Sequence, residues 1–172
     1  MKYNILGCQI VIGKQKIKVF NIHLSDVPNT FYSLYKIPYY DTPKRVSYKR
    51  AVDLSYESKQ DDIKQILKNS NEKDKVIIVG DFNEPSHLDY EVGWKVSKTL
   101  YKHNFIDIVR YYYADASKYP LYSCDIERVE NKVNIPVRVD MIYIYNVKPK
   151  DVKYIYKSYL SDHIPILATV VI

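Results

Sequence analysis

The sequence has few cysteines and no long apolar run. Its 172 residues include only two cysteines, Cys8 and Cys124, which lie far apart and lack the spacing of metal-binding pairs. They indicate neither a disulfide framework nor a zinc site, and we expect both to be small buried residues. No apolar stretch approaches membrane-spanning length, and the start of the chain does not resemble a signal peptide. These absences predict an intracellular protein without a membrane span.

The chain also lacks internal repeats, low-complexity tracts and linkers, so a single domain over residues 1–172 is expected. Hydrophobic residues at 47% and charged residues at 27% are typical of a globular protein. The net charge of +6 favours phosphate-bearing partners. No basic cluster exceeds a few residues, however, so a lysine-rich solvated surface explains the charge as well.

Residues 75–89 form an apolar run that ends at a carboxylate. Four β-branched residues, Val76 to Val79, predict a strand buried on both faces, and Gly80 lets the backbone turn after it. Asp81 and Asn83 therefore lie at the carboxyl end of a core strand, where scaffolds present catalytic groups. Both residue types are also favoured in ordinary turns, so this segment alone leaves a catalytic and a structural interpretation open.

Periodicity and turn residues predict the other elements. They are a hairpin over residues 2–11 and 14–20 that leads to His23, helices over 47–69 and 93–103, and strands over 121–125, 137–145, 152–156 and 164–172. Residues 27–46 are expected to be a long loop beside the site, residues 125–134 a polar connection, and residues 147–150 a turn. The charges of the first helix, Lys59 among them, are expected to face solvent. Strand, helix and buried strand in this order indicate an α/β fold.

The strand expected over residues 137–145 carries a carboxylate among apolar residues. Alternation places Asp140 on the same face as Arg138, Ile142 and Ile144. A carboxylate in such a strand is costly unless it is paired, so Asp140 requires a buried partner. Arg138 is one candidate for that partner.

Four segments together resemble the signature motifs of a known family. They are FNIHLSD at residues 20–26, GDFN at 80–83, RVDMIY at 138–143 and LSDHIP at 160–165. In this order they are similar to the endonuclease/exonuclease/phosphatase family, the deoxyribonuclease-like metal-dependent phosphoesterases. The resemblance implies a layered α/β sandwich of two packed mixed sheets flanked by helices. It also implies a missing N-terminal segment, because family members begin with further strands that carry an Asn and a metal-binding Glu. Such a truncation would leave a sheet edge exposed and would remove any leader.

The resemblance also implies roles for six residues. Asp81 would orient the attacking water, His23 and Asn83 would contact the phosphate, Asp140 would hold His163, and Asp162 and Asp81 would bind Mg²⁺ or Mn²⁺. His163 is therefore preferred to Arg138 as the partner of Asp140. The sequence leaves open whether His163 is a general base or a charged phosphate donor.

The function that follows is a divalent-metal-dependent phosphoester hydrolase, expected to be a phosphodiesterase that acts on nucleic-acid or nucleotide-like substrates. A lipid-headgroup diester is an alternative substrate. A second alternative is a catalytically impaired remnant that binds phosphate-bearing ligands without turnover. A purely structural or interaction protein ranks last, because it would leave the polar residues at the strand ends without a purpose.

Overall fold

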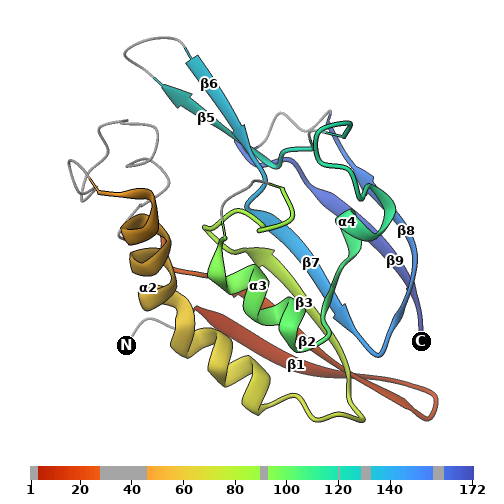
Figure 1. The fold of residues 1–172 in the computed structure, drawn as a ribbon. Helices are drawn as coiled ribbons and strands as arrows, with labels where there is room; N and C mark the ends of the chain where they lie inside the picture. The colour runs from red at the N-terminus through yellow and green to blue at the C-terminus, as the bar shows by residue number, and fades with distance from the viewer. Residues whose placement is uncertain (1–3, 28–45, 90–92, 120, 129–132, 157–160) are drawn as a thin grey trace.

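A five-stranded mixed sheet forms the centre of the fold (Figure 1). Its order is β1-β2-β3-β7-β4. The strands are β1 (Ile5–Ile12), β2 (Gln15–His23), β3 (Lys75–Asp81), β4 (Ile106–Asp107) and β7 (Asp140–Tyr145). β2 and β3 are parallel, and the other neighbours are antiparallel. Because β2 and β3 run the same way, their carboxyl ends, at His23 and Asp81, meet at one edge of the sheet.

Two strand pairs and three helices complete the computed structural model, which describes residues 4–27, 46–89, 93–119, 121–128, 133–156 and 161–172. The strand pairs are β5 (Cys124–Arg128) with β6 (Val133–Val137), and β8 (Lys148–Tyr154) with β9 (Ile166–Val171). The helices are α2 (Tyr48–Lys68), α3 (Lys95–Lys102) and α4 (Ile108–Tyr112). No helix of the described residues has the length and apolarity that a membrane crossing needs.

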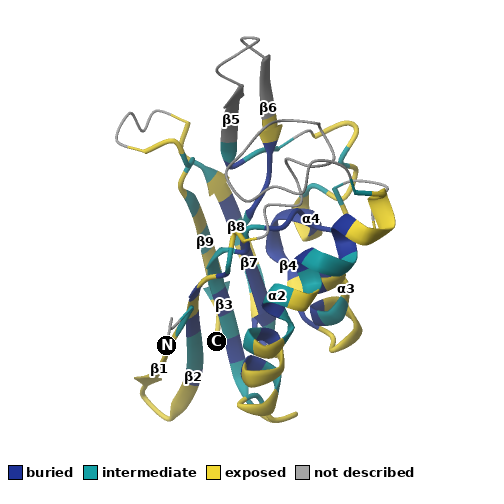
Figure 2. Ribbon diagram, turned by 90° about the vertical axis from the view of Figure 1, so that its left-hand side faces the viewer, coloured by how far each residue is buried: buried dark blue, intermediate teal, exposed yellow. Residues whose placement is uncertain are grey.

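Helices α2 and α3 cover one face of the central sheet (Figure 2). α2 begins where the Ser47 side chain accepts a hydrogen bond from the backbone N–H of Arg50, which satisfies one of the free donors of the first turn. Ile63 and Ile66 of α2 then pack into the core between helix and sheet. The prediction that Lys59 faces solvent was wrong, because this side chain is only 1% exposed and its ammonium group donates to Ser55.

The β8–β9 pair packs on the other face of the sheet. Ile142 and Ile144 of β7 contact a second core that includes Val152 of β8 and Ile166 of β9. Strand β7 thus sends alternate side chains into two cores, as the alternation in its sequence predicts. A mixed sheet between a helical layer and a β layer confirms the predicted layered α/β class.

Several local predictions were wrong. The polar connection predicted over residues 125–134 contains most of β5 and the start of β6, because backbone pairing does not require apolar side chains. The turn predicted at residues 147–150 lies earlier, since Asn146 takes a left-handed conformation (φ 53°) that Asn tolerates. Cys8 is exposed and Cys124 is partly exposed, so neither is a buried residue. Residues 28–45 of the predicted long loop lie outside the described residues.

Candidate active site

Three predicted site residues form one row across three strands. In the strand register His23 of β2 is opposite Asp81 of β3, and Asp81 is opposite Asp140 of β7. Directly opposed residues point to the same face of a sheet, so the three side chains lie side by side. They are on the face that α2 and α3 leave free, because the apolar neighbours Val79 and Ile142 on that face contact the β8–β9 core. The register therefore assembles the row.

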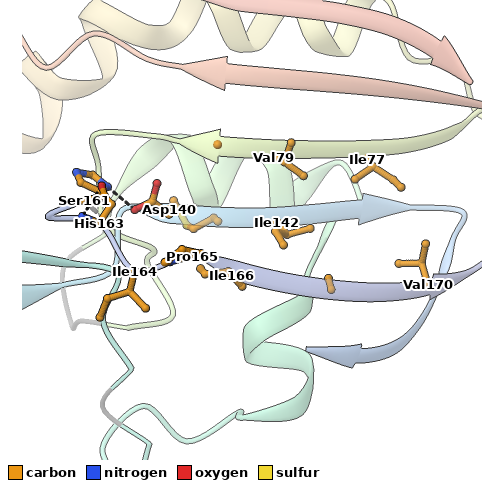
Figure 3. Close-up of a pocket in the computed structure, with 13 residues that line it drawn as sticks. Ile77, Val79, Asp140, Ile142, Ser161, His163, Ile164, Pro165, Ile166 and Val170 are labelled. Carbon is orange, nitrogen blue, oxygen red and sulfur yellow. Dashed lines mark hydrogen bonds and ion pairs between the residues drawn. The ribbon is translucent and has the colours of Figure 1, made fainter. Parts of the chain in front are cut away.

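His163 joins this row from the segment before β9. Its Nδ1 lies 2.7 Å from Oδ2 of Asp140 (Figure 3). The backbone holds the segment in place, because Ile164 N donates to the carbonyl of Ser123 at 2.6 Å and His163 forms an isolated β-bridge with Cys124. His163, which the family resemblance favours over Arg138, is thus the observed partner of Asp140. At the other end of the row, Nε2 of the mostly exposed His23 lies 3.7 Å from Oδ2 of Asp81.

The Asp140 carboxylate strongly favours the charged form of His163. Since an ionised carboxylate only accepts hydrogen bonds, Nδ1 of His163 is the donor in this contact. This hydrogen bond, with a smaller contribution from the side chain of Cys124, raises the pKa of His163 to about 11. His163 is therefore an imidazolium at neutral pH. Its second ring N–H is then available to an anionic ligand, which favours the charged-donor interpretation over the general base.

The surroundings of Asp81 disfavour its charged form, whereas those of His163 favour the charged form. Burial raises the pKa of its carboxyl group, and the nearby Asp140 carboxylate raises it further. One oxygen accepts a hydrogen bond from the backbone N–H of Asn83 at 2.7 Å, which lowers the pKa by less than burial raises it. A carboxylate with a raised pKa is suited to accept a proton from water. A cation beside this carboxylate would stabilise its charged form.

Asn83 holds the end of β2 against the loop that follows β3. Its backbone is left-handed (φ 45°), and its Nδ2 donates to the carbonyl of Leu24 at 2.8 Å. One of its two amide protons is therefore used within the protein, which leaves the other for a ligand. The predicted contact between Asn83 and a phosphate stays a prediction.

Glu84 fixes the same loop to both helices and was not identified from the sequence. It is 1% exposed, accepts a hydrogen bond from Ser55 of α2 at 2.6 Å, and accepts another from the backbone N–H of Val96 of α3 at 2.9 Å. Burial raises the pKa of Glu84, and the neighbouring Lys59 opposes that shift. An acidic residue directly after the GDFN motif was the available signal, but its partners lie 29 and 12 residues away.

A buried ion network anchors the far end of this loop. Arg138 is fully buried and donates to both oxygens of Asp89 (2.8 and 2.9 Å) and both oxygens of Asp107 (3.1 and 2.6 Å). Nε of Arg110 donates to Asp89 as well, at 2.5 Å. Arg138 is thus engaged away from Asp140, and the loop from Asp81 to Asp89 is held at both ends. A rigid loop of this kind is what a preorganised site needs.

The predicted metal ligands are only partly brought together. Asp81 lies in the row, whereas Asp162 is exposed on the segment before β9. In the part of the chain that the structure describes, no three His, Cys, Asp or Glu side chains are close enough to hold a metal ion. Mg²⁺ is commonly bound by one or two carboxylates together with substrate phosphates and water, so the Asp81–Asp140 pair fits such an ion. The role of Asp162 stays a prediction.

The fold built from these elements is that of the endonuclease/exonuclease/phosphatase proteins. Solved structures with this fold include an AP endonuclease from Archaeoglobus fulgidus, with a TM-score of 0.54 and 18% identity over 89% of this chain and 61% of that chain. An endonuclease/exonuclease/phosphatase family protein from Leptotrichia buccalis has a TM-score of 0.57 and 18% identity over 98% of this chain and 54% of its own.

A third similar structure is D. rerio TDP2 complexed with a single-strand DNA product, with a TM-score of 0.59 and 18% identity over 98% of this chain and 61% of its own. No protein-family model and no curated protein matches the chain. The chain thus spans between 54% and 61% of the three similar structures. These similarities, each at 18% identity, establish a shared fold.

Proposed function

We propose that the chain is a phosphoester hydrolase that acts on phosphodiesters of nucleic acids or nucleotides with the help of Mg²⁺ or Mn²⁺. The observation that carries the proposal is the row of His23, Asp81 and Asp140 with His163 held against its end. The cationic donor His163 in line with a carboxylate of raised pKa suits the hydrolysis of a charged ester.

In the proposed reaction, Asp81 orients a water molecule and accepts its proton as the water oxygen bonds to phosphorus and the bond to the leaving oxygen breaks. His163 donates its second N–H to a non-bridging phosphate oxygen and offsets the negative charge that develops there. Asp140 fixes the tautomer and ring orientation of His163. His23 contacts the phosphate from the opposite end of the row. A divalent ion would supply further charge stabilisation, with Asp81, Asp140 and the predicted ligand Asp162 as the residues to hold it.

The preference for a nucleic-acid or nucleotide diester rests on charge and on similar structures. The net charge is +6, which favours polyanionic ligands. Two of the similar structures are an AP endonuclease and a TDP2 that holds a single-strand DNA product. A mannosyl-6-phosphatase from Bacteroides thetaiotaomicron has a similar structure too, with a TM-score of 0.50 at 15% identity, so the fold also serves phosphomonoesters.

The test is hydrolysis of bis(4-nitrophenyl) phosphate by residues 1–172 with Mg²⁺, with Mn²⁺ and with EDTA. We expect metal-dependent turnover that falls about 100-fold or more in His163→Ala, since the variant loses a charged donor to the transition state. His103→Ala is the matched control, because His103 caps α3 and its Nδ1 lies 2.9 Å from the carbonyl of Thr99, away from the row. Turnover that is equal in both variants would contradict the assignment. A folded protein without turnover would instead support the phosphate-binding remnant.

A further inference from the structure

The pair of Asp140 and His163 joins two segments that lie apart in the sequence. The two residues are 23 positions apart, and Nδ1 of His163 lies 2.7 Å from Oδ2 of Asp140 (Figure 3). Asp140 is the first residue of β7, whereas His163 lies on the segment before β9. The side chain of His163 is 32% exposed and that of Asp140 is 23% exposed, so burial alone does not hold them in place. Their relative position therefore depends on the backbone that carries each of them.

Strand β7 begins where the chain passes from one sheet to another. β6, which pairs with β5, ends at Val137, and β7 of the central sheet begins at Asp140. At this crossing the backbone N–H groups of Val139 and Asp140 need acceptors, because a buried N–H group without a partner costs free energy. Consecutive N–H groups of a regular strand point to opposite sides, so a single neighbouring strand does not serve both.

The hydroxyl group of Ser123 accepts both of these hydrogen bonds. Its Oγ lies 3.1 Å from the backbone nitrogen of Val139 and 2.9 Å from that of Asp140. A hydroxyl oxygen has two lone pairs, so one side chain can satisfy two neighbouring donors. Ser123 is 0% exposed, and bulk water therefore does not compete for these donors. On the other side, the carbonyl of Val139 accepts a hydrogen bond from the N–H of Phe82 at 2.9 Å, so the start of β7 is held from two directions.

The backbone of the same serine holds the segment that carries His163. The carbonyl of Ser123 accepts a hydrogen bond from the N–H of Ile164 at 2.6 Å, and its own N–H donates to the carbonyl of Val137 at 3.0 Å. The residue after Ser123, Cys124, forms the isolated β-bridge with His163. One residue thus contacts the chain at Asp140 through its side chain and directly after His163 through its backbone.

We propose that Ser123 is a positioning residue, which sets the distance between Asp140 and His163 and thereby the direction of the second ring N–H of His163. Its hydroxyl fixes the start of β7, and its carbonyl fixes the residue after His163. A misplaced donor weakens the transition state more than the bound substrate, because negative charge develops on the phosphate oxygen during the reaction. The expected effect on rate rests on the proposed function, whereas the geometry of the pair can be tested without turnover.

Ser123→Ala removes the shared acceptor and leaves the backbone carbonyl in place. The proton on Nδ1 of His163 reports on the pair in proton NMR spectra, because a short charge-assisted hydrogen bond moves the resonance of such a proton far downfield. We expect this resonance to move upfield or to disappear in Ser123→Ala. With bis(4-nitrophenyl) phosphate as substrate, we expect kcat to fall about 10-fold or more and KM to change less than about two-fold, since the donor acts mainly on the transition state.

Ser97→Ala is the matched control for this substitution. Ser97 is also 0% exposed, and its Oγ likewise contacts two nitrogen atoms: it accepts a hydrogen bond from the backbone N–H of His87 at 2.8 Å and lies 3.0 Å from Nδ1 of the same residue. The two variants therefore remove the same group from equally buried positions. We expect both to lower the thermal midpoint and only Ser123→Ala to change the resonance of His163.

Hydrogen exchange in the unchanged protein gives a measurement that does not depend on how well a variant folds. We expect the amides of Val139 and Asp140 to exchange at least about 100-fold more slowly than exposed amides of the same chain. Fast exchange of both amides would overturn the proposal, and so would a folded Ser123→Ala protein that keeps the resonance of His163. The same change of resonance in Ser97→Ala would overturn it as well, because lost stability would then be the cause. A lack of turnover in the unchanged protein would contradict the proposed function alone, and the resonance would still decide whether Ser123 positions the pair.

Discussion

Replacing Arg138 with methionine tests the buried ion network that anchors the loop after β3. Arg138 makes four hydrogen bonds to Asp89 and Asp107, and both acceptor side chains are at most 4% exposed. In the variant Asp89 keeps Arg110, whereas Asp107 keeps, among the described residues, only the backbone N–H groups of Val109 and Arg110. A buried carboxylate then remains without a cation, a change that costs about 3 to 5 kcal/mol.

Urea unfolding followed by circular dichroism measures this cost. With a slope of about 2 kcal/mol per M, the expected loss lowers the unfolding midpoint by about 1.5 to 2.5 M. Lys18→Met is the matched control, because its ion pair with Asp74 is 2.7 Å long but about a quarter exposed. A partly exposed pair of this kind contributes about 1 kcal/mol at most.

The double variant Arg138→Met/Asp107→Asn separates lost charge from lost packing. Asparagine can still cap α4 but carries no charge, so the double variant should regain about 1 kcal/mol or more relative to Arg138→Met. A loss below about 1 kcal/mol in the single variant would refute the reasoning. A double variant no more stable than the single one would show that the unpaired carboxylate is not the cause.

Two further predictions concern the site itself. In Asp140→Asn the pKa of His163 should fall from about 11 by at least two units, as measured by NMR titration of its ring nitrogens, because the charged hydrogen-bond partner is lost. Since this folded-state pKa is raised, the pair stabilises the fold fully below about pH 6.5, and its contribution disappears as the pH rises toward 11; an unchanged pKa in the variant would contradict this account. Gly80→Ala should lower the thermal midpoint strongly, because Gly80 has φ +132° and a Cβ there would collide with the carbonyl oxygen of Ile22. Gly93→Ala, where a Cβ meets open space, is its control, and equal midpoints for the two variants would count against the strain.

The sequence predicts the strands and helices with strong periodicity. The helix predicted over residues 47–69 is observed as Tyr48–Lys68 with Ser47 as its cap, and the run Val76 to Val79 lies within β3. β5 and β6 were missed, although Val133, Ile135 and Val137 of β6 recur at the two-residue spacing of a strand. The two-residue strand β4 and the five-residue helix α4 are too short to give a periodic signal.

The positions of candidate site residues that adjoin a strand could be predicted from the sequence. Contacts between charged residues that lie far apart in the sequence could not. Asp81 could be placed because it follows a continuous apolar run, and Asp140 could be placed because the residues of its strand alternate between two faces. The contacts of Arg138 with Asp89 and Asp107 span 49 and 31 residues, and no local pattern encodes them. Lys59 looks like a surface residue in its helix, and only the packing of α2 shows that it is buried.

The site row depends on strand register, and Gly80 helps to set it. A slip of β3 by one residue would turn Asp81 to the helical face and break the row with His23 and Asp140, because neighbouring side chains on a strand point to opposite faces. The backbone of Ile22 approaches Gly80 so closely that no side chain fits between the two strands. The glycine before Asp81 therefore does more than permit a turn. It lets β2 and β3 come together at the residues where the row of candidate site residues begins.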